Sequence, residues 1–373
     1  MDFKPLILHL FLSSFIPVGA LLCLTTPAAA IADPERIRVG VQTTLTGDAA
    51  TFGTDIRHAL EFANATWMQN RYEFIFEDDK CTARGGVDVA TKFASITKVK
   101  YVLGPACNEA LIPAAAIYER SGITVLSAVA TTGDILDVGK HIFRMFPSDG
   151  SSAEVLYHYI AARHRRLALY SEENQYPVMV ASTFSRLSAL TARPLEIIEE
   201  NWAVGTYEHR TALAKLIGSK PDAFFINANV EASYGMVLRQ LRALKYAGQI
   251  YASYWPASED AMQTLGKAND GVVFVNTPQI ETSLTSMGRE AYASYVKQYG
   301  KPLSISLGIA VTMDSLRLLD LAIRSNRPVS EFLHTINFEG LVGKISFDTN
   351  GAIQGIPFQI QQIVNGNVVV VQR

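Results

Sequence analysis

The stretch Ile37–Met68 (IRVGVQTTLTGDAATFGTDIRHALEFANATWM) decides the fold class of this 373-residue chain. Its start, Ile37–Thr43, is a β-branched run, and Asp55–Met68 reads as a helix. A strand-like run, a turn rich in Gly and Thr, and a helix-like run predict a β-strand followed by a helix that covers it. The same order returns along most of the chain.

Strand-like and helix-like runs alternate beyond this first unit. Nearly continuous apolar strands separated by helices are typical of parallel sheets that are covered on both faces. About 340 residues follow the N-terminal segment, more than one hydrophobic core usually serves. We therefore expect an α/β fold with two doubly wound parallel-sheet lobes. The later strand-like runs are Tyr72–Glu77, Tyr101–Leu103, Thr124–Val129, Leu167–Ser171, Leu195–Glu199, Ala223–Asn227 and Ile250–Tyr254.

Residues 1–32 have the layout of a secretory signal peptide. Lys4 supplies a positive charge, Pro5–Leu24 is mostly apolar, and Ala28-x-Ala30 and Ala30-x-Ala32 are small-residue cleavage signals. Cleavage after Ala30 and cleavage after Ala32 both stay open. We expect the mature protein to be secreted into the periplasm.

Two other interpretations of this segment are weaker. A short transmembrane anchor is disfavoured because cleavage signals follow the apolar run directly and no basic stop-transfer cluster does. A lipid anchor at Cys23 is disfavoured because Leu22 stands where lipoprotein processing needs a small residue. After residue 32, no apolar run reaches the roughly 18 residues that a membrane span needs.

Export leaves two of the three cysteines, Cys81 and Cys107. An even pair in an oxidising compartment is a disulfide candidate, and two buried free thiols are the alternative. No His or further Cys lies at ligand spacing around either residue, so we expect no metal site.

The charge pattern and the motifs argue against several classes of function. The net charge is −2 and no five like charges adjoin, which disfavours a nucleic-acid surface or a basic membrane patch. The chain has no HExxH, GxSxG or GxGxxG motif. Gly133–His141 (GDILDVGKH) is not a phosphate loop, because it has one residue too many between its glycines. His also stands where Ser or Thr should follow the Lys. We expect neither an enzyme nor a cofactor.

Three loops that follow predicted strands are small and polar. They are Thr43–Gly53, Gly104–Asn108 and Ser127–Gly133. The first two run into helices, and helix N-termini carry unpaired N–H groups and partial positive charge. Each loop alone is most simply a capped helix start, but three at the ends of successive strands indicate a site for a carboxylate.

These residues bring out a family resemblance over essentially the whole mature chain. The chain resembles ABC transporter substrate-binding proteins of the leucine/isoleucine/valine-binding family, which are type I periplasmic binding proteins. The order and spacing of the motifs carry the resemblance more than any single motif does. The motifs are Val39–Gly53 (VGVQTTLTGDAATFG), Glu77–Cys81 (EDDKC), Tyr101–Cys107 (YVLGPAC), Ile117–Val125 (IYERSGITV), Ser127–Thr132 (SAVATT), Asp222–Asn227 (DAFFIN), Leu238–Leu241 (LRQL) and Gly343–Gly351 (GKISFDTNG).

The resemblance implies two lobes that close around a small ligand, with three chain crossings at the hinge. These crossings are expected near Phe146–Ser148, Thr277–Pro278 and Phe347–Thr349. Lobe 1 would combine 33–146 with 278–347, and lobe 2 would combine 147–277 with 348–373. The resemblance also implies a bridge between Cys81 and Cys107.

The same resemblance implies where the ligand binds. Lobe 1 would hold a ligand carboxylate at Asn108, Ala130 and Thr131, with Phe52 against its side. Lobe 2 would contribute Tyr176, Asn229 and Trp255.

This sequence departs from the family at two of these positions. Asn108 stands where amino-acid binders have Ser, and Trp255 stands where they have the Glu that pairs with the ligand ammonium. Glu231 and Glu259 are the nearest acids. We therefore expect a ligand with a carboxylate or comparable polar head and an apolar or aromatic body, in place of a standard amino-acid head.

Together these expectations describe a monomeric periplasmic solute-binding protein. It would bind an amino acid or an apolar or aromatic acid and deliver it to the membrane permease of an ABC importer. A ligand-sensing periplasmic protein of the same fold is the alternative, and a secreted enzyme is a distant third.

Overall fold

The computed structural model describes residues 36–47, 49–133, 135, 137–304 and 306–372. The expected signal peptide, residues 1–32, lies outside the described residues. None of the described helices is both long and apolar enough to cross a membrane.

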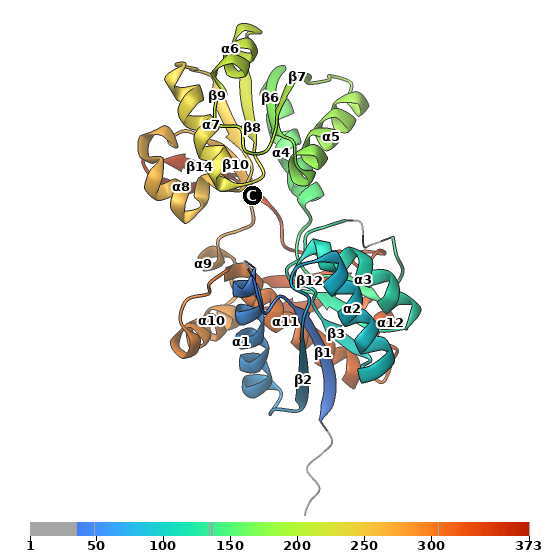
Figure 1. The fold of residues 1–373 in the computed structure, drawn as a ribbon. Helices are drawn as coiled ribbons and strands as arrows, with labels where there is room; N and C mark the ends of the chain where they lie inside the picture. Colours follow the sequence, from blue (N-terminus) through green and yellow to red (C-terminus); the bar gives the residue numbers. More distant parts are fainter. Residues whose placement is uncertain (1–35, 48, 134, 136, 305, 373) are drawn as a thin grey trace, which may run out of the picture. The chain divides into compact units, whose positions relative to one another are not determined.

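The first sheet follows directly from the alternating pattern of the N-terminal third. It has five parallel strands in the order β2-β1-β3-β4-β5, so the chain winds outward in both directions from β1 and β3. Figure 1 labels β1, β2 and β3 of this sheet. The strands are β1 (Ile37–Thr43), β2 (Tyr72–Asp78), β3 (Tyr101–Leu103), β4 (Thr124–Ser127) and β5 (Ile142–Arg144).

Helices cover both faces of this sheet because alternate strand residues point to opposite sides. Leu103 and Leu126 belong to a core shared with α1, α10 and α11, whereas Val102 and Val125 belong to a core shared with α2 and α3. The helices on this part of the chain are α1 (Ala50–Trp67), α2 (Ala83–Lys92), η1 (Phe93–Thr97), α3 (Asn108–Arg120), α9 (Ile280–Ser283), α10 (Ser286–Tyr299), α11 (Ser306–Arg324) and α12 (Val329–Leu333).

The second sheet has seven strands in the order β15-β14-β10-β9-β8-β6-β7. The five strands from β10 to β7 are parallel, and β14 and β15 are antiparallel additions at one edge. The strands are β6 (Arg166–Glu172), β7 (Glu196–Trp202), β8 (Ala223–Asn227), β9 (Gln249–Ala252), β10 (Val273–Asn276), β14 (Gln359–Val364) and β15 (Asn367–Gln372).

Two cores again lie on opposite faces of the sheet. Helices α4 and α5 pack on one face and α6, α7 and α8 on the other. The expected α/β fold with two mostly parallel, doubly covered sheets is confirmed. The helices are α4 (Asp149–Ala161), α5 (Gln175–Leu190), α6 (Arg210–Gly218), α7 (Glu231–Ala243), η2 (Trp255–Ala257), α8 (Glu259–Thr264) and η3 (Gly266–Ala268).

The third passage of the chain between the sheets lies further along than expected. A small antiparallel sheet joins β11 (Phe338–Gly340), β12 (Gly343–Phe347) and β13 (Ile353–Gln354). Phe347 pairs with Ile353, and Ile353 and Ile356 belong to the core of the first sheet. The passage is therefore made by 355–358, and not by Phe347–Thr349, because β13 folds back on β12 before the chain leaves.

Candidate functional site

Two cavities lie where strand-end loops of the first sheet meet helices and loops of the second. One, of about 430 Å³, is lined by the start of α3, the loop 131–133 and the first turns of α4 and α5. The other, of about 320 Å³, is lined by Phe146, Tyr254, Trp255 and the end of β10. Both cavities share Thr131 and Asp149.

Five of the seven side chains predicted for the site line these cavities. Asn108, Tyr176 and Asn229 line the larger cavity, Trp255 the smaller, and Thr131 both. The other two are placed elsewhere. Phe52 is half-buried in α1 against the core of the first sheet, and Ala130 is buried under α2 and α3.

Asn108 is bonded to the very loop on which a ligand carboxylate was expected. Its Oδ1 accepts the backbone N–H groups of Thr131 and Thr132 at 2.9 and 3.1 Å. Its Nδ2 donates to Thr131 Oγ1 at 3.1 Å. The side-chain amide thus sits where the carboxylate head was predicted to bind.

Asp149, like Tyr254, is a residue of this site that was not predicted from the sequence. It opens α4, whose preceding residue Ser148 caps the helix by accepting the N–H of Ser151 at 3.0 Å. The Asp149 carboxylate accepts hydrogen bonds from Thr131 Oγ1 at 2.7 Å and from Tyr254 Oη at 3.0 Å. It therefore links the loop after β4 to the loop after β9.

Burial raises the pKa of the Asp149 carboxyl above its ordinary value. The hydroxyls of Thr131 and Tyr254 and the positive charge of Arg144 oppose this rise without cancelling it. The sequence signal for this residue is its place in the first turn of a helix, which many acids without a binding role share.

Trp255 and the neighbouring acid Glu231 are held by hydrogen bonds. The indole N–H donates to the Ala228 carbonyl at 2.9 Å. Glu231 accepts the Ser258 hydroxyl and, at 2.6 Å, the Ala261 N–H at the start of α8. Glu231 thus acts as a cap for α8, and the Glu259 side chain lies outside the described part of the structure.

A covalent bridge fixes the start of α3 beside the loop after β2. The sulfur atoms of Cys81 and Cys107 are bonded, 1.97 Å apart, with Cα atoms 5.4 Å apart. Asp79, whose pKa is raised by burial, accepts Thr44 Oγ1 at 3.0 Å and the Cys81 N–H at 2.9 Å close by. This network positions Asn108, the residue next to Cys107.

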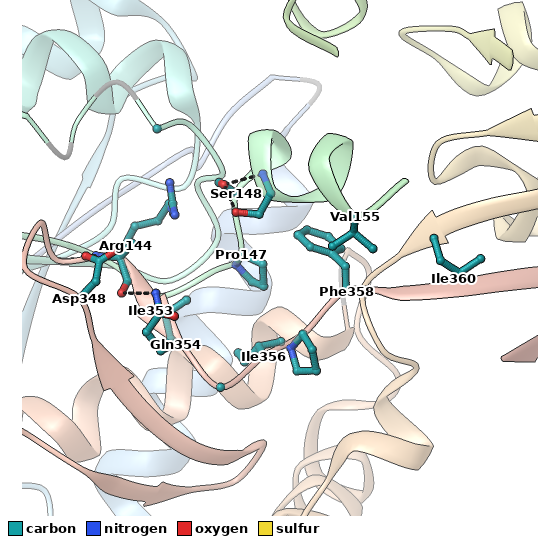
Figure 2. A pocket seen from close by; sticks show the side chains of 15 residues that line it. Arg144, Pro147, Ser148, Val155, Asp348, Ile353, Gln354, Ile356, Phe358 and Ile360 are labelled. Atoms are coloured by element: carbon teal, nitrogen blue, oxygen red, sulfur yellow. Dashed lines mark hydrogen bonds between the residues drawn. The ribbon is translucent and has the colours of Figure 1, made fainter. Parts of the chain in front are cut away.

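A third and larger cavity of about 870 Å³ lies along the connecting segments, and none of the seven predicted residues lines it. Figure 2 shows Arg144 beside Asp348 on one side of it and Val155, Phe358 and Ile360 towards the other. The Arg144 side chain is held by the carbonyls of Phe146 and Thr132, at 2.9 and 2.8 Å. This cavity adjoins the connecting segments, and Gly133 is the residue of the loop Ser127–Gly133 that lines it.

Comparison with known proteins assigns the chain to a family. A family model described as "Periplasmic binding protein" matches residues 36–367. The chain belongs to this periplasmic binding protein family.

Relatives of this family resemble the chain over most of their length. The Leu/Ile/Val-binding protein of Escherichia coli K12 is 21% identical over 91% of this chain and 94% of its own. The leucine-, isoleucine-, valine-, threonine- and alanine-binding protein of Pseudomonas aeruginosa is 22% identical over 88% of this chain and 90% of its own.

Solved structures share the fold. A putative branched-chain amino acid ABC transporter protein from Rhodospirillum rubrum superposes with a TM-score of 0.75 at 19% identity, over 90% of this chain and all of that one. An ABC transporter substrate-binding protein from Desulfitobacterium hafniense, solved in complex with Leu, superposes with a TM-score of 0.72 at 22% identity. The match again covers 90% of this chain and all of that one. The family resemblance inferred from the motifs is confirmed.

Proposed function

We propose that this protein is the periplasmic ligand-binding subunit of an ABC importer, which captures a small metabolite and delivers it to a membrane permease. The observation that carries the proposal is the pair of cavities that share Thr131 and Asp149. Residues associated with both sheets line them, so a bound ligand would contact both lobes and stabilise their closure.

An amino acid is the first ligand class to test, because the relatives are named for amino-acid binding. We propose that the protein acts as a monomer after removal of residues 1–32, and that it releases its ligand chemically unchanged. We place lobe 1 at 33–146 plus 278–356 and lobe 2 at 147–277 plus 357–373. The third crossing follows the pairing of β13 with β12.

The test is a calorimetric screen of the mature protein against amino acids, carboxylic acids and amines. We expect one compound to bind with a dissociation constant of about 1 µM or lower, and mass spectrometry to recover it unaltered. A screen without any saturable ligand, or a ligand converted during incubation, would overturn the proposal.

A further inference from the structure

The backbone donors of the loop after β4 already have an acceptor. Each backbone N–H carries a single proton, and those of Thr131 and Thr132 both point to Asn108 Oδ1, at 2.9 and 3.1 Å. A ligand carboxylate on these groups would have to displace a neutral amide that already satisfies them. Asn108 therefore occupies the place of an anion.

The charged side chains that line the two cavities are acidic. The described residues lining the two cavities that share Thr131 and Asp149 include two acids, Glu109 and Asp149, and no Lys, Arg or His. Asp149 forms no ion pair within 4.0 Å among the described residues, and the positive charge of Arg144 acts on it only from further away. An anionic ligand head would lose hydration and face a like charge, whereas a cationic head would gain a partner.

Asp149 and its aromatic neighbours can still accept contacts from a ligand. An ionised carboxylate has about four acceptor positions, and the hydroxyls of Thr131 and Tyr254 fill two of them. The rings of Tyr254 and Trp255 line the same cavity as Asp149. The indole N–H is already bonded to Ala228, so Trp255 can offer a ligand its ring surface.

We propose that the head group recognised here is an organic cation, a primary or quaternary ammonium, bound between the Asp149 carboxylate and the rings of Tyr254 and Trp255. Asn108 excludes a carboxylate from the N–H groups of Thr131 and Thr132. The inference rests on the proposed function, and it reverses the head-group charge expected from the sequence. The ligand class is an amine with an apolar or aromatic body.

The first experiment compares ligands that share a body and differ in the head. Phenethylamine, phenylalanine and 3-phenylpropionate form one series, isoamylamine, leucine and 4-methylvalerate a second, and choline is the quaternary probe. In calorimetry we expect an amine or choline to bind at least about 30-fold more tightly than the matched acid.

Asp149→Asn should weaken binding of the preferred cation by about 30-fold or more, while binding of the acids does not fall. Asp88→Asn, a change at an exposed acid of α2, is the matched control and should leave both unchanged. If Asp149→Asn lowers the melting temperature, a comparison of Trp255→Leu with Trp255→Phe serves as the test in its place. Loss of the ring should weaken cation binding about fivefold or more, and Phe should retain most of it.

Asn108→Ser provides a gain-of-binding test. The shorter side chain frees the Thr131 and Thr132 donors, so leucine and the acids should bind at least about tenfold more tightly. Asn350→Ser, in an exposed turn, is the control with the same change of residue.

The outcomes separate this inference from the proposed function. Tight binding of an acid, with no binding of the matched amine, would overturn the proposal of a cationic head group. It would leave the solute-binding proposal standing. Unchanged acid affinity in Asn108→Ser would overturn the role of Asn108. Failure of every compound in the screen would count against the proposed function itself.

Discussion

Asp314 and Arg317 of α11 form a buried ion pair in the core of the first sheet. Arg317 Nη1 lies 2.6 Å from Asp314 Oδ1, and the Asp314 side chain is 0% exposed. Asp314 Oδ2 also accepts the Leu341 N–H at 2.6 Å, which ties α11 to the loop before β12. We expect Arg317→Met to cost about 3 kcal/mol of unfolding free energy, because it leaves a buried charge without its partner.

Urea unfolding at neutral pH measures this cost. Arg84→Met is the control, since the pair Arg84–Asp88 is 93% and 69% exposed and such surface pairs contribute about 0–1 kcal/mol. The double variant Arg317→Met with Asp314→Asn should recover part of the loss. Equal losses in Arg317→Met and Arg84→Met would contradict this interpretation.

The same carboxyl predicts a dependence of stability on pH. Burial raises the pKa of Asp314 to about 6, against an ordinary value near 3.9 in the unfolded chain. Between these values the folded state binds more protons than the unfolded state. The contribution of Asp314 to the free energy of unfolding therefore falls as pH rises from about 4 to about 6. Asp314→Asn should remove this decline from urea midpoints measured at successive pH values. A variant profile that keeps the wild-type slope would rule out Asp314 as its source.

The binding residues show which side-chain positions the sequence could and could not predict. The family resemblance implied Asn108 and Thr131 as binding residues, and both belong to strand-end loops. Their mutual hydrogen bonds depend on side-chain directions that no spacing reveals. Asp149 was missed because it looks like any acid in a first helical turn. Its partners Thr131 and Tyr254 lie 18 and 105 residues away.

The connection from β13 to β14 depends on one glycine. Gly355 has a φ of +105°, and a Cβ there would lie 1.8 Å from the Lys344 carbonyl oxygen. We expect Gly355→Ala to lower the free energy of unfolding by more than about 2 kcal/mol, because steric overlap adds to backbone strain. Gly366→Ala is the matched control, with a φ of +73° and no atom within 4 Å of its Cβ. Urea midpoints compare the two, and equal losses would show that the contact with Lys344 is relieved cheaply.

The bridge between the loop after β2 and the start of α3 can be tested in the same way. Denatured, unreduced mature protein should show essentially no titratable thiol, because Cys81 and Cys107 are bonded. The variant with both Cys81→Ser and Cys107→Ser should lose about 3–4 kcal/mol of unfolding free energy, since the bridge closes a loop of about 27 residues in the unfolded chain. Two free thiols in the unreduced protein would contradict the bridge.

Elements were easier to predict than the connections between them. Asn365-Gly366, the turn of the β14–β15 hairpin, is a dipeptide typical of such turns, and both residues have the positive φ, 51° and 73°, that the turn needs. The third crossing was misplaced, because the pairing of Phe347 with Ile353 is decided by packing against the core of the first sheet. Local sequence records a turn there but not which sheet the next residues join.

The whole molecule should respond to its ligand through the three connecting segments. Thr131 and Asp149 line both candidate cavities, and the bond from Tyr254 to Asp149 at 3.0 Å already joins the loop after β9 to the start of α4. A ligand that contacts residues of both sheets favours the arrangement in which both contacts are made. We expect saturating ligand to reduce the radius of gyration in X-ray scattering. Hydrogen exchange should slow in the loop 131–133 and in the first turns of α4 and α5, while α12, which lines neither cavity, serves as the internal reference. A saturating ligand that alters neither measurement would indicate a rigid pocket, and ligand capture would then occur without closure.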